Sequence, residues 1–156
     1  MRHKDATSSL EDLSDGRFQM VIPDQGKLEA EQVKRVIFCS GKVYYDLATW
    51  RAENERSDTA IIRIEQLYPF PEESLLAAIE SYTNLERVVW CQEEPKNQGA
   101  WYQSQHHIRK VADQVNPGLG GELGFAGRAE SAAPAAGYMA VHSEQQRSLV
   151  DKAFNG

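Results

Sequence analysis

RVIFCSGKVYYDLATWRAENE, residues 35–55, reads as a strand, a tight turn and a helix in direct succession. RVIFC is a short β-branched and aromatic run, which is typical of a buried strand. A Ser-Gly pair follows it, and Val43, Leu47 and Trp50 then recur on one helical face. This succession is the repeating unit of an α/β protein.

The same unit returns further along the chain. TAIIRIEQL, residues 59–67, predicts a second strand, and a helix follows it with Pro71 and two glutamates in its first turn. RVVWC, residues 87–91, predicts a third strand, followed by a helix from near Gly99 to about Val115. The buried face of the helix after Pro71 should consist of Leu75, Leu76, Ile79 and Tyr82.

The last third of the chain continues this alternation. LGFAG, residues 123–127, predicts a fourth strand, and residues 128–139 are small and loop-like. A last helix is expected to begin at Ser143, with Gln146 placed to complete a capping box. Leu149, Val150, Ala153 and Phe154 would anchor its second half.

This order predicts an α/β fold of three layers, α/β/α, around a mostly parallel sheet. Residues 35–156 should form this domain. Residues 1–34 show no sustained hydrophobic period, and turn formers break them up, so we predict a lead-in arm or linker there. One short helix is expected in it after Ser9, because Ser9 and Asp12 have capping spacing.

Composition excludes several classes of protein. The chain has 156 residues, 26% of them charged, and a net charge of −6, so Lys and Arg do not cluster as nucleic acid or an anionic membrane requires. No apolar run could span a bilayer, and the polar N-terminus does not resemble a signal peptide, so we expect a cytosolic protein. Cys39 and Cys91 each end an apolar run, which favours inert buried thiols over a disulfide or a metal site.

The stretch WCQEEPKNQGAWYQSQHH, residues 90–107, contains the residue types of a catalytic site. His106 and His107 are adjacent on the predicted helix and therefore cannot converge on one metal ion. Glu93 and Glu94 follow a strand end, so their side chains should diverge rather than form a catalytic pair. We therefore predict no catalytic residue and no metal site here.

Binding of an anion is the remaining chemistry that the residues allow. Ser40 and Lys42 lie at the first turn from strand to helix, and Asn97 and Gln98 lead into the N-terminus of a later helix. Free backbone amides at such places can hold phosphate or carboxylate, although a plain turn and ordinary capping are the competing interpretations. Arg128 follows the fourth strand and either joins the same crevice or pairs with Glu130 or a neighbouring domain.

Four motifs together resemble one family, the 2-oxoglutarate dehydrogenases. They are CSGKVYYDL at 39–47, RIEQLYPFP at 63–71, WCQEEPKNQGAW at 90–101 and AGRAESAAPAAGY at 126–138. The resemblance covers essentially the whole chain, in order, and is to the C-terminal end of the decarboxylating component. The ending YMAVHSEQQ is similar to bacterial members, which implies a bacterial cytoplasm.

The resemblance implies a fragment with a fold like the C-terminal domain of transketolase, including one antiparallel strand. Thiamine diphosphate and magnesium would be held by upstream domains, so no catalytic or cofactor-binding residue carries over and the fragment alone should be inactive. Implied partners are the upstream domains of the same polypeptide, a homodimer partner and the dihydrolipoyl succinyltransferase. Trp101, Tyr102 and Tyr138 are our candidates for exposed aromatic docking surface.

Some members of that family respond to adenylates or acetyl-coenzyme A near domain boundaries. If this segment contributes to such a site, its polar groups would be Ser40, Lys42, Asn97, Gln98 and Arg128. The alternative function is a free-standing, non-catalytic module that dimerises or binds a small anionic effector.

Overall fold

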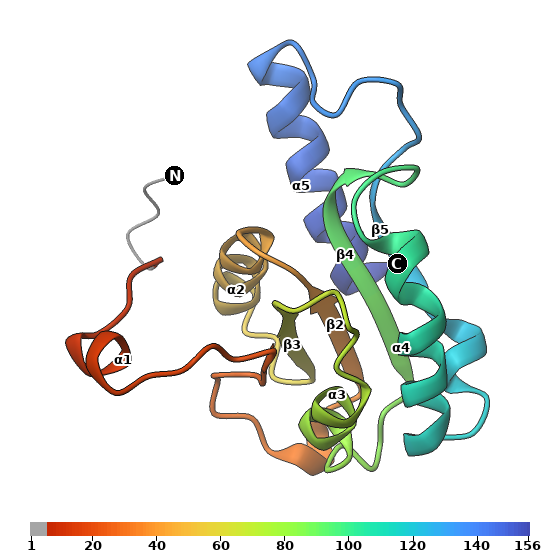
Figure 1. The fold of residues 1–156 in the computed structure, drawn as a ribbon. Helices are drawn as coiled ribbons and strands as arrows, with labels where there is room; N and C mark the ends of the chain where they lie inside the picture. Colours follow the sequence, from red (N-terminus) through yellow and green to blue (C-terminus); the bar gives the residue numbers. More distant parts are fainter. Residues whose placement is uncertain (1–5) are drawn as a thin grey trace.

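The computed structural model describes residues 6–156, and the first five residues of the predicted arm lie outside the described residues. Five strands form one sheet in the order β1-β3-β2-β4-β5 (Figure 1). The strands are β1 (Val21–Ile22), β2 (Arg35–Cys39), β3 (Thr59–Ile64), β4 (Arg87–Pro95) and β5 (Gly124–Arg128). β1 pairs antiparallel with β3, and the other neighbours are parallel. The mostly parallel sheet is therefore confirmed.

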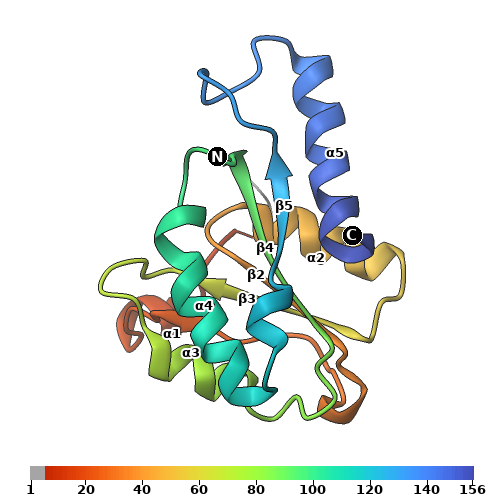
Figure 2. The ribbon, with the colours of Figure 1, turned by 90° about the vertical axis from the view of Figure 1, so that its right-hand side faces the viewer.

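Helices cover both faces of this sheet, which gives the predicted three layers (Figure 2). α3 (Glu72–Ile79) and α4 (Trp101–Val115) pack on one face. α2 (Val43–Glu53) and α5 (Met139–Asn155) pack on the other face. Strands buried on both sides can be apolar throughout, which explains why RVIFC and RVVWC do not alternate with polar residues.

The register of the central strands divides the core into two halves. Val36 and Phe38 of β2 point to the side of α3 and α4, and Ile37 and Cys39 point to the side of α2 and α5. On the second side, Trp50 of α2 stacks on Phe154 of α5 with ring centroids 4.2 Å apart. The predicted anchors of the last helix, Leu149, Val150, Ala153 and Phe154, are all buried in this half.

The arm contributes more to the domain than its sequence indicated. The expected helix is present as α1 (Leu10–Ser14), with the capping box between Ser9 and Asp12. Further on, Oδ2 of Asp24 accepts a hydrogen bond from the backbone N–H of Ile61 at 2.6 Å and pairs with Arg51. Val33, just after the short helix η1 (Ala30–Gln32), is fully buried. The division into 1–34 and 35–156 stays a prediction, and residues 21–33 supply a strand and a core side chain.

Three boundaries in the sequence prediction were wrong. The last helix begins at Met139 rather than Ser143, because Tyr138 is the extended residue that precedes it and Met-Ala-Val continues the helix. Gln146 therefore lies inside the helix and donates to Asp46 at 2.8 Å instead of capping. β3 ends at Ile64, three residues before the predicted end. β4 continues through the two glutamates to Pro95, because Pro95 pairs with Arg128 of β5.

Candidate functional site at the carboxyl edge of the sheet

The carboxyl ends of β2 and β4 frame a hollow of about 580 Å³. From β2 the chain runs to β3 on one side and then returns past β2 to β4 on the other side. Adjacent strands whose connections leave in opposite directions form the crevice at which open α/β sheets usually bind ligands. The hollow is lined by Ser40, Gly41, Lys42, Leu67, Trp90, Gln92, Glu93, Glu94, Gly99, Ala100 and Gln103.

Gln92 lines this hollow, its side chain is buried, and it makes more hydrogen bonds than its polar neighbours there. Its Oε1 accepts from the indole N–H of Trp90 at 2.8 Å and from the backbone N–H of Trp101 at 3.1 Å. Its Nε2 lies within 2.8–3.2 Å of the carbonyl oxygens of Glu94, Pro95 and Gln98. The side-chain amide of Gln92 thus provides hydrogen-bond partners for the buried polar groups along the turn between β4 and α4.

Gly99 is required by this arrangement. Its φ is +64°, a left-handed value that side chains disfavour, and a Cβ there would lie 3.0 Å from Nε2 of Gln92. The turn therefore closes tightly onto the Gln92 amide.

Gln92 was not among the predicted site residues, although the alternation of side chains along its strand indicated that it is buried. In β4, alternate side chains face the same way, so Gln92 follows Val88 and Trp90 toward α4. A glutamine at a core position needs several partners, and the loop behind it supplies them.

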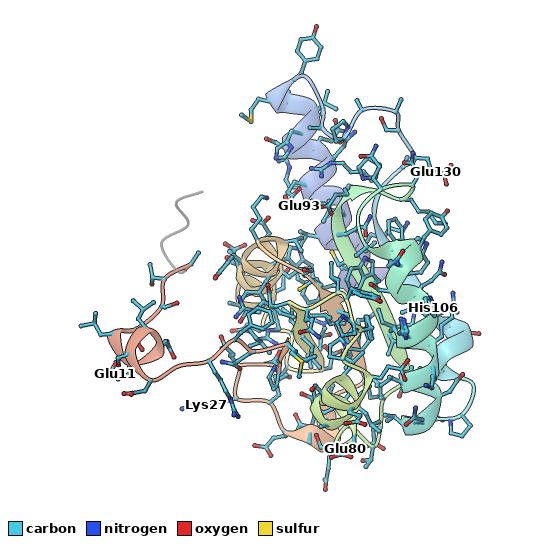
Figure 3. The ribbon with its side chains drawn as sticks, in the orientation of Figure 1. Glu11, Lys27, Glu80, Glu93, His106 and Glu130 are labelled. Carbon is cyan, nitrogen blue, oxygen red and sulfur yellow. The ribbon has the colours of Figure 1, made fainter. Side chains whose placement is uncertain are left out.

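Lys42 and Glu93 form an ion pair across the mouth of the hollow. Lys42 comes from the turn after β2, and Glu93 comes from the end of β4. Glu94 also lines the hollow but is exposed, and the divergence of the two carboxylates stays a prediction. In Figure 3, Glu93 lies where β4 ends beside α5, whereas His106 lies on the outward side of α4.

Arg128 at the end of β5 is held by hydrogen bonds to neighbours in this chain. Its Nε donates to Gln145 at 3.0 Å, and one Nη donates to Gln146 at 2.8 Å and lies 3.3 Å from Nδ1 of His142. The other Nη donates to the backbone carbonyl of Glu93. Arg128 thus joins β4, β5 and the first half of α5, and within residues 6–156 its hydrogen bonds go to Glu93, Gln145 and Gln146 rather than to Glu130.

Asn97 and Gln98 both bind the loop that follows β5. The Asn97 amide exchanges two hydrogen bonds with the backbone of Ser131, each 3.0 Å long. Gln98 donates to the same Ser131 carbonyl at 2.9 Å. Of the five residues predicted to bind an effector, Ser40 and Lys42 line the hollow, whereas Asn97, Gln98 and Arg128 position this loop and α5.

A second polar cluster joins α3 to α4. Glu72 lies 2.6 Å from Nδ1 of His107 and 2.5 Å from Nζ of Lys110. The hydrogen bond from Lys110, and after it the one from His107, holds the pKa of the Glu72 carboxyl below its ordinary value. The His107 ring also stacks on Phe70, with centroids 4.7 Å apart. These contacts fix α4 against α3, so we assign the cluster a structural role.

The thiols and the aromatic candidates can now be placed. Cys39 and Cys91 are paired in register on β2 and β4, are free and buried, and burial raises the pKa of both thiols. Trp101 is buried against the sheet, so it was wrong as a candidate for exposed surface. Tyr102 and Tyr138 are 55% and 79% exposed, as predicted.

Neither a metal cluster nor a membrane span emerges from the described part of the chain. Between residues 6 and 156, no three His, Cys, Asp or Glu side chains lie close enough to hold one ion together. No helix in that range is long and apolar enough to cross a bilayer.

The architecture defines the class of protein. A solved structure titled "Split gene transketolase, inactive beta4 tetramer" superposes with a TM-score of 0.56, over 88% of this chain and 42% of that chain. At 17% identity this likeness concerns the fold alone, which is an α/β domain of the transketolase type.

Sequence comparison then identifies the family. Residues 7–154 match the family described as 2-oxoglutarate dehydrogenase C-terminal, and the chain belongs to it. The 2-oxoglutarate dehydrogenase E1 component of Azotobacter vinelandii is 56% identical over 154 residues, and that of Cupriavidus necator is 54% identical over 154 residues. Each match covers 99% of this chain but 16% of the relative. The chain thus spans about one sixth of the length of these relatives.

Proposed function

We propose that the chain is the C-terminal part of a bacterial 2-oxoglutarate dehydrogenase. The complete enzyme would oxidatively decarboxylate 2-oxoglutarate in the cytoplasm and pass a succinyl group to lipoamide on the dihydrolipoyl succinyltransferase. The observation that carries this proposal is the match over 7–154 to a family of C-terminal segments, with 56% identity to a relative about six times longer.

Within such an enzyme this segment would support assembly. Thiamine diphosphate would supply the carbanion chemistry, with magnesium to hold its phosphates. We assign that role to residues outside this chain; within residues 6–156 no three His, Cys, Asp or Glu side chains lie close enough to hold one ion together. The polar residues beside the hollow are largely satisfied by one another, as Gln92 and Arg128 show. Upstream domains and a homodimer partner would complete the site elsewhere.

Activity of two polypeptides tests the proposal. The 156-residue chain should bind no thiamine diphosphate and release no carbon dioxide from 2-oxoglutarate. The complete polypeptide purified from the source should be several times heavier than 17.5 kDa and should decarboxylate 2-oxoglutarate. A native protein of 17.5 kDa without this activity would favour the free-standing module instead.

A second candidate function is binding of an anionic effector, adenylate or acetyl-coenzyme A, at the hollow. It is favoured by the position of Ser40 and Lys42, which line a space at the crevice between diverging strands. Lys42 is partly exposed, so it can turn from Glu93 to a phosphate. Asn97, Gln98 and Arg128 would then act indirectly, by positioning the loop after β5 and the helix α5.

Thermal shift measurements test this second candidate. AMP or acetyl-coenzyme A at millimolar concentration should raise the melting temperature, because a ligand that binds only the folded state stabilises it. Lys42→Ala should abolish the shift, whereas Lys27→Ala, at an exposed position away from the hollow, should retain it. No shift with either ligand, or an equal shift in both variants, would rule out this site.

A further inference from the structure

The segment 132–141, AAPAAGYMAV, is a run of ten uncharged residues on the surface of an otherwise charged protein. All of its residues are exposed except Ala136, which is half-buried. Tyr138 and Met139 are 79% and 78% exposed, and Val141 is 41% exposed. The largest exposed apolar patch of a soluble protein is often functional, and contact with another protein surface is one such use.

This segment, which we name the docking segment, lies where α5 projects beyond the sheet (Figure 1). α5 begins at Met139, yet its first buried residue is Leu149. The first ten residues of the helix therefore contribute nothing to the core and present their apolar side chains outward.

The projecting half of α5 is nevertheless held in place. Arg128 binds Gln145 and Gln146 on the inner side of the helix, and Gln146 in turn binds Asp46 of α2. The loop that leads to the docking segment is fixed at Ser131 by Asn97 and Gln98. A segment that is positioned in advance loses little conformational entropy when it docks.

The area and the charge of the segment restrict its partner. Tyr138, Met139 and Val141 together offer on the order of 300 Å² of apolar surface, given that an aromatic side chain buries about 150–250 Å². A stable complex between separate proteins buries about 800 Å² on each partner, so a second copy of this chain would be held too weakly by this contact. Docking within one polypeptide needs less area, because the linker keeps the local concentration high.

A membrane is a poor partner for the same surface. The docking segment carries no Lys or Arg, and the charged residues that flank it are the acidic Glu130 and Glu144. Anionic headgroups attract basic residues and repel acidic ones.

We infer that residues 132–141 dock into an apolar surface on another part of the same, longer polypeptide. The inference rests on the proposed function, because the relatives are about six times longer than this chain and so supply such a partner. Asn97, Gln98 and Arg128 are positioning residues for this contact.

Oxidation of Met139 by hydrogen peroxide tests the inference. Trypsin releases residues 129–147 as one peptide whose only methionine is Met139, so mass spectrometry follows its conversion to the sulfoxide. The rate is compared between the 156-residue chain and the complete polypeptide. We expect oxidation at least about tenfold slower in the complete polypeptide, because covered sulfur reacts only when the contact opens.

The outcomes separate this inference from the proposed function. A complete enzyme that decarboxylates 2-oxoglutarate but oxidises Met139 as fast as the short chain overturns the docking and leaves the function intact. Protection that appears in the concentrated short chain assigns the partner to a second copy and also overturns it. Loss of activity in every preparation, together with a native mass of 17.5 kDa, instead overturns the function.

A pair of variants gives an independent measurement. In the complete polypeptide, replacing both Tyr138 and Met139 by Ser should lower the melting temperature and increase cleavage by trypsin after Arg147. Ser148→Ala, at an exposed position on the same helix but outside the docking segment, should change neither. Equal behaviour of the double variant and Ser148→Ala would contradict the inference.

Discussion

Replacement of Gln92 by Leu should destabilise the domain by about 3–4 kcal/mol. The variant leaves two buried donors, the indole N–H of Trp90 and the backbone N–H of Trp101, without their acceptor. Each unsatisfied buried donor costs about 1–3 kcal/mol, so the two together cost about 4 kcal/mol before Leu recovers a fraction by apolar burial. The carbonyl oxygens of Glu94 and Gln98 also lose the Gln92 amide as a donor, whereas that of Pro95 keeps the backbone N–H of Gln98 at 2.8 Å.

Urea unfolding followed by tryptophan fluorescence measures this loss. With a slope of about 2 kcal/mol per molar urea, the midpoint should fall by about 1.5–2 M. Since domains of this size are stable by about 5–15 kcal/mol, the variant should still fold. Gln103→Leu is the matched control, because Gln103 lines the same hollow but is exposed, and it should change stability by less than about 0.5 kcal/mol.

Two results would refute the reasoning about Gln92. The first is a loss of less than about 1 kcal/mol in Gln92→Leu, which would mean that water or a rearranged loop satisfies the freed groups. The second is an equal loss in Gln103→Leu, which would attribute the effect to added apolar surface at the hollow.

The remaining predictions concern the glycines, one carboxylate and the thiols. Gly41 and Gly99 both have positive φ, but only at Gly99 would a Cβ meet other atoms, so urea unfolding should show about 1 kcal/mol of strain in Gly41→Ala and clearly more in Gly99→Ala. The lowered pKa of Glu72 means that its stabilising contribution is complete above its ordinary value of 4.5 and is lost as pH falls through the folded-state pKa. The stability difference between the native chain and Glu72→Gln should therefore shrink in urea titrations as the pH is lowered from 7 to 3, and a constant difference would contradict the assignment. Because burial raises the pKa of the Cys39 and Cys91 thiols, neither should react with Ellman's reagent at pH 8 until urea unfolds the chain, and rapid reaction of the folded protein would disprove their burial.

The sequence predicted the elements of the sheet well because its strands are buried on both faces. RVIFC, TAIIRI and RVVWC consist mostly of β-branched, aliphatic and aromatic residues, and a short apolar run between turn signals has few other interpretations. The face of α4 was also predictable, since Ile108, Val111 and Ala112 recur at helical spacing and are all buried. Periodicity gives no comparable signal at the start of α5, where no residue before Leu149 is buried, and the predicted start was four residues late.

The candidate site was harder to predict because its residues meet only through tertiary contacts. Arg128 binds side chains 14 to 18 residues further along the chain, and Asn97 binds Ser131, 34 residues away. From sequence, such polar groups near strand ends are equally consistent with a ligand. Gln92 could have been inferred from the alternation of β4, but its five partners include three backbone carbonyls whose directions depend on the folded turn.

The outer strands of the sheet also have a consequence for aggregation. β1 has only two residues, and it covers the open side of β3, whose sequence TAIIRI has high β propensity and little charge. An uncovered apolar strand can pair with a strand from another molecule. A fragment that starts at residue 35 would lack β1 and the Asp24 contact to Ile61, and would leave this strand free to seed intermolecular sheets. Soluble expression of this domain should therefore require that the chain begin before Val21.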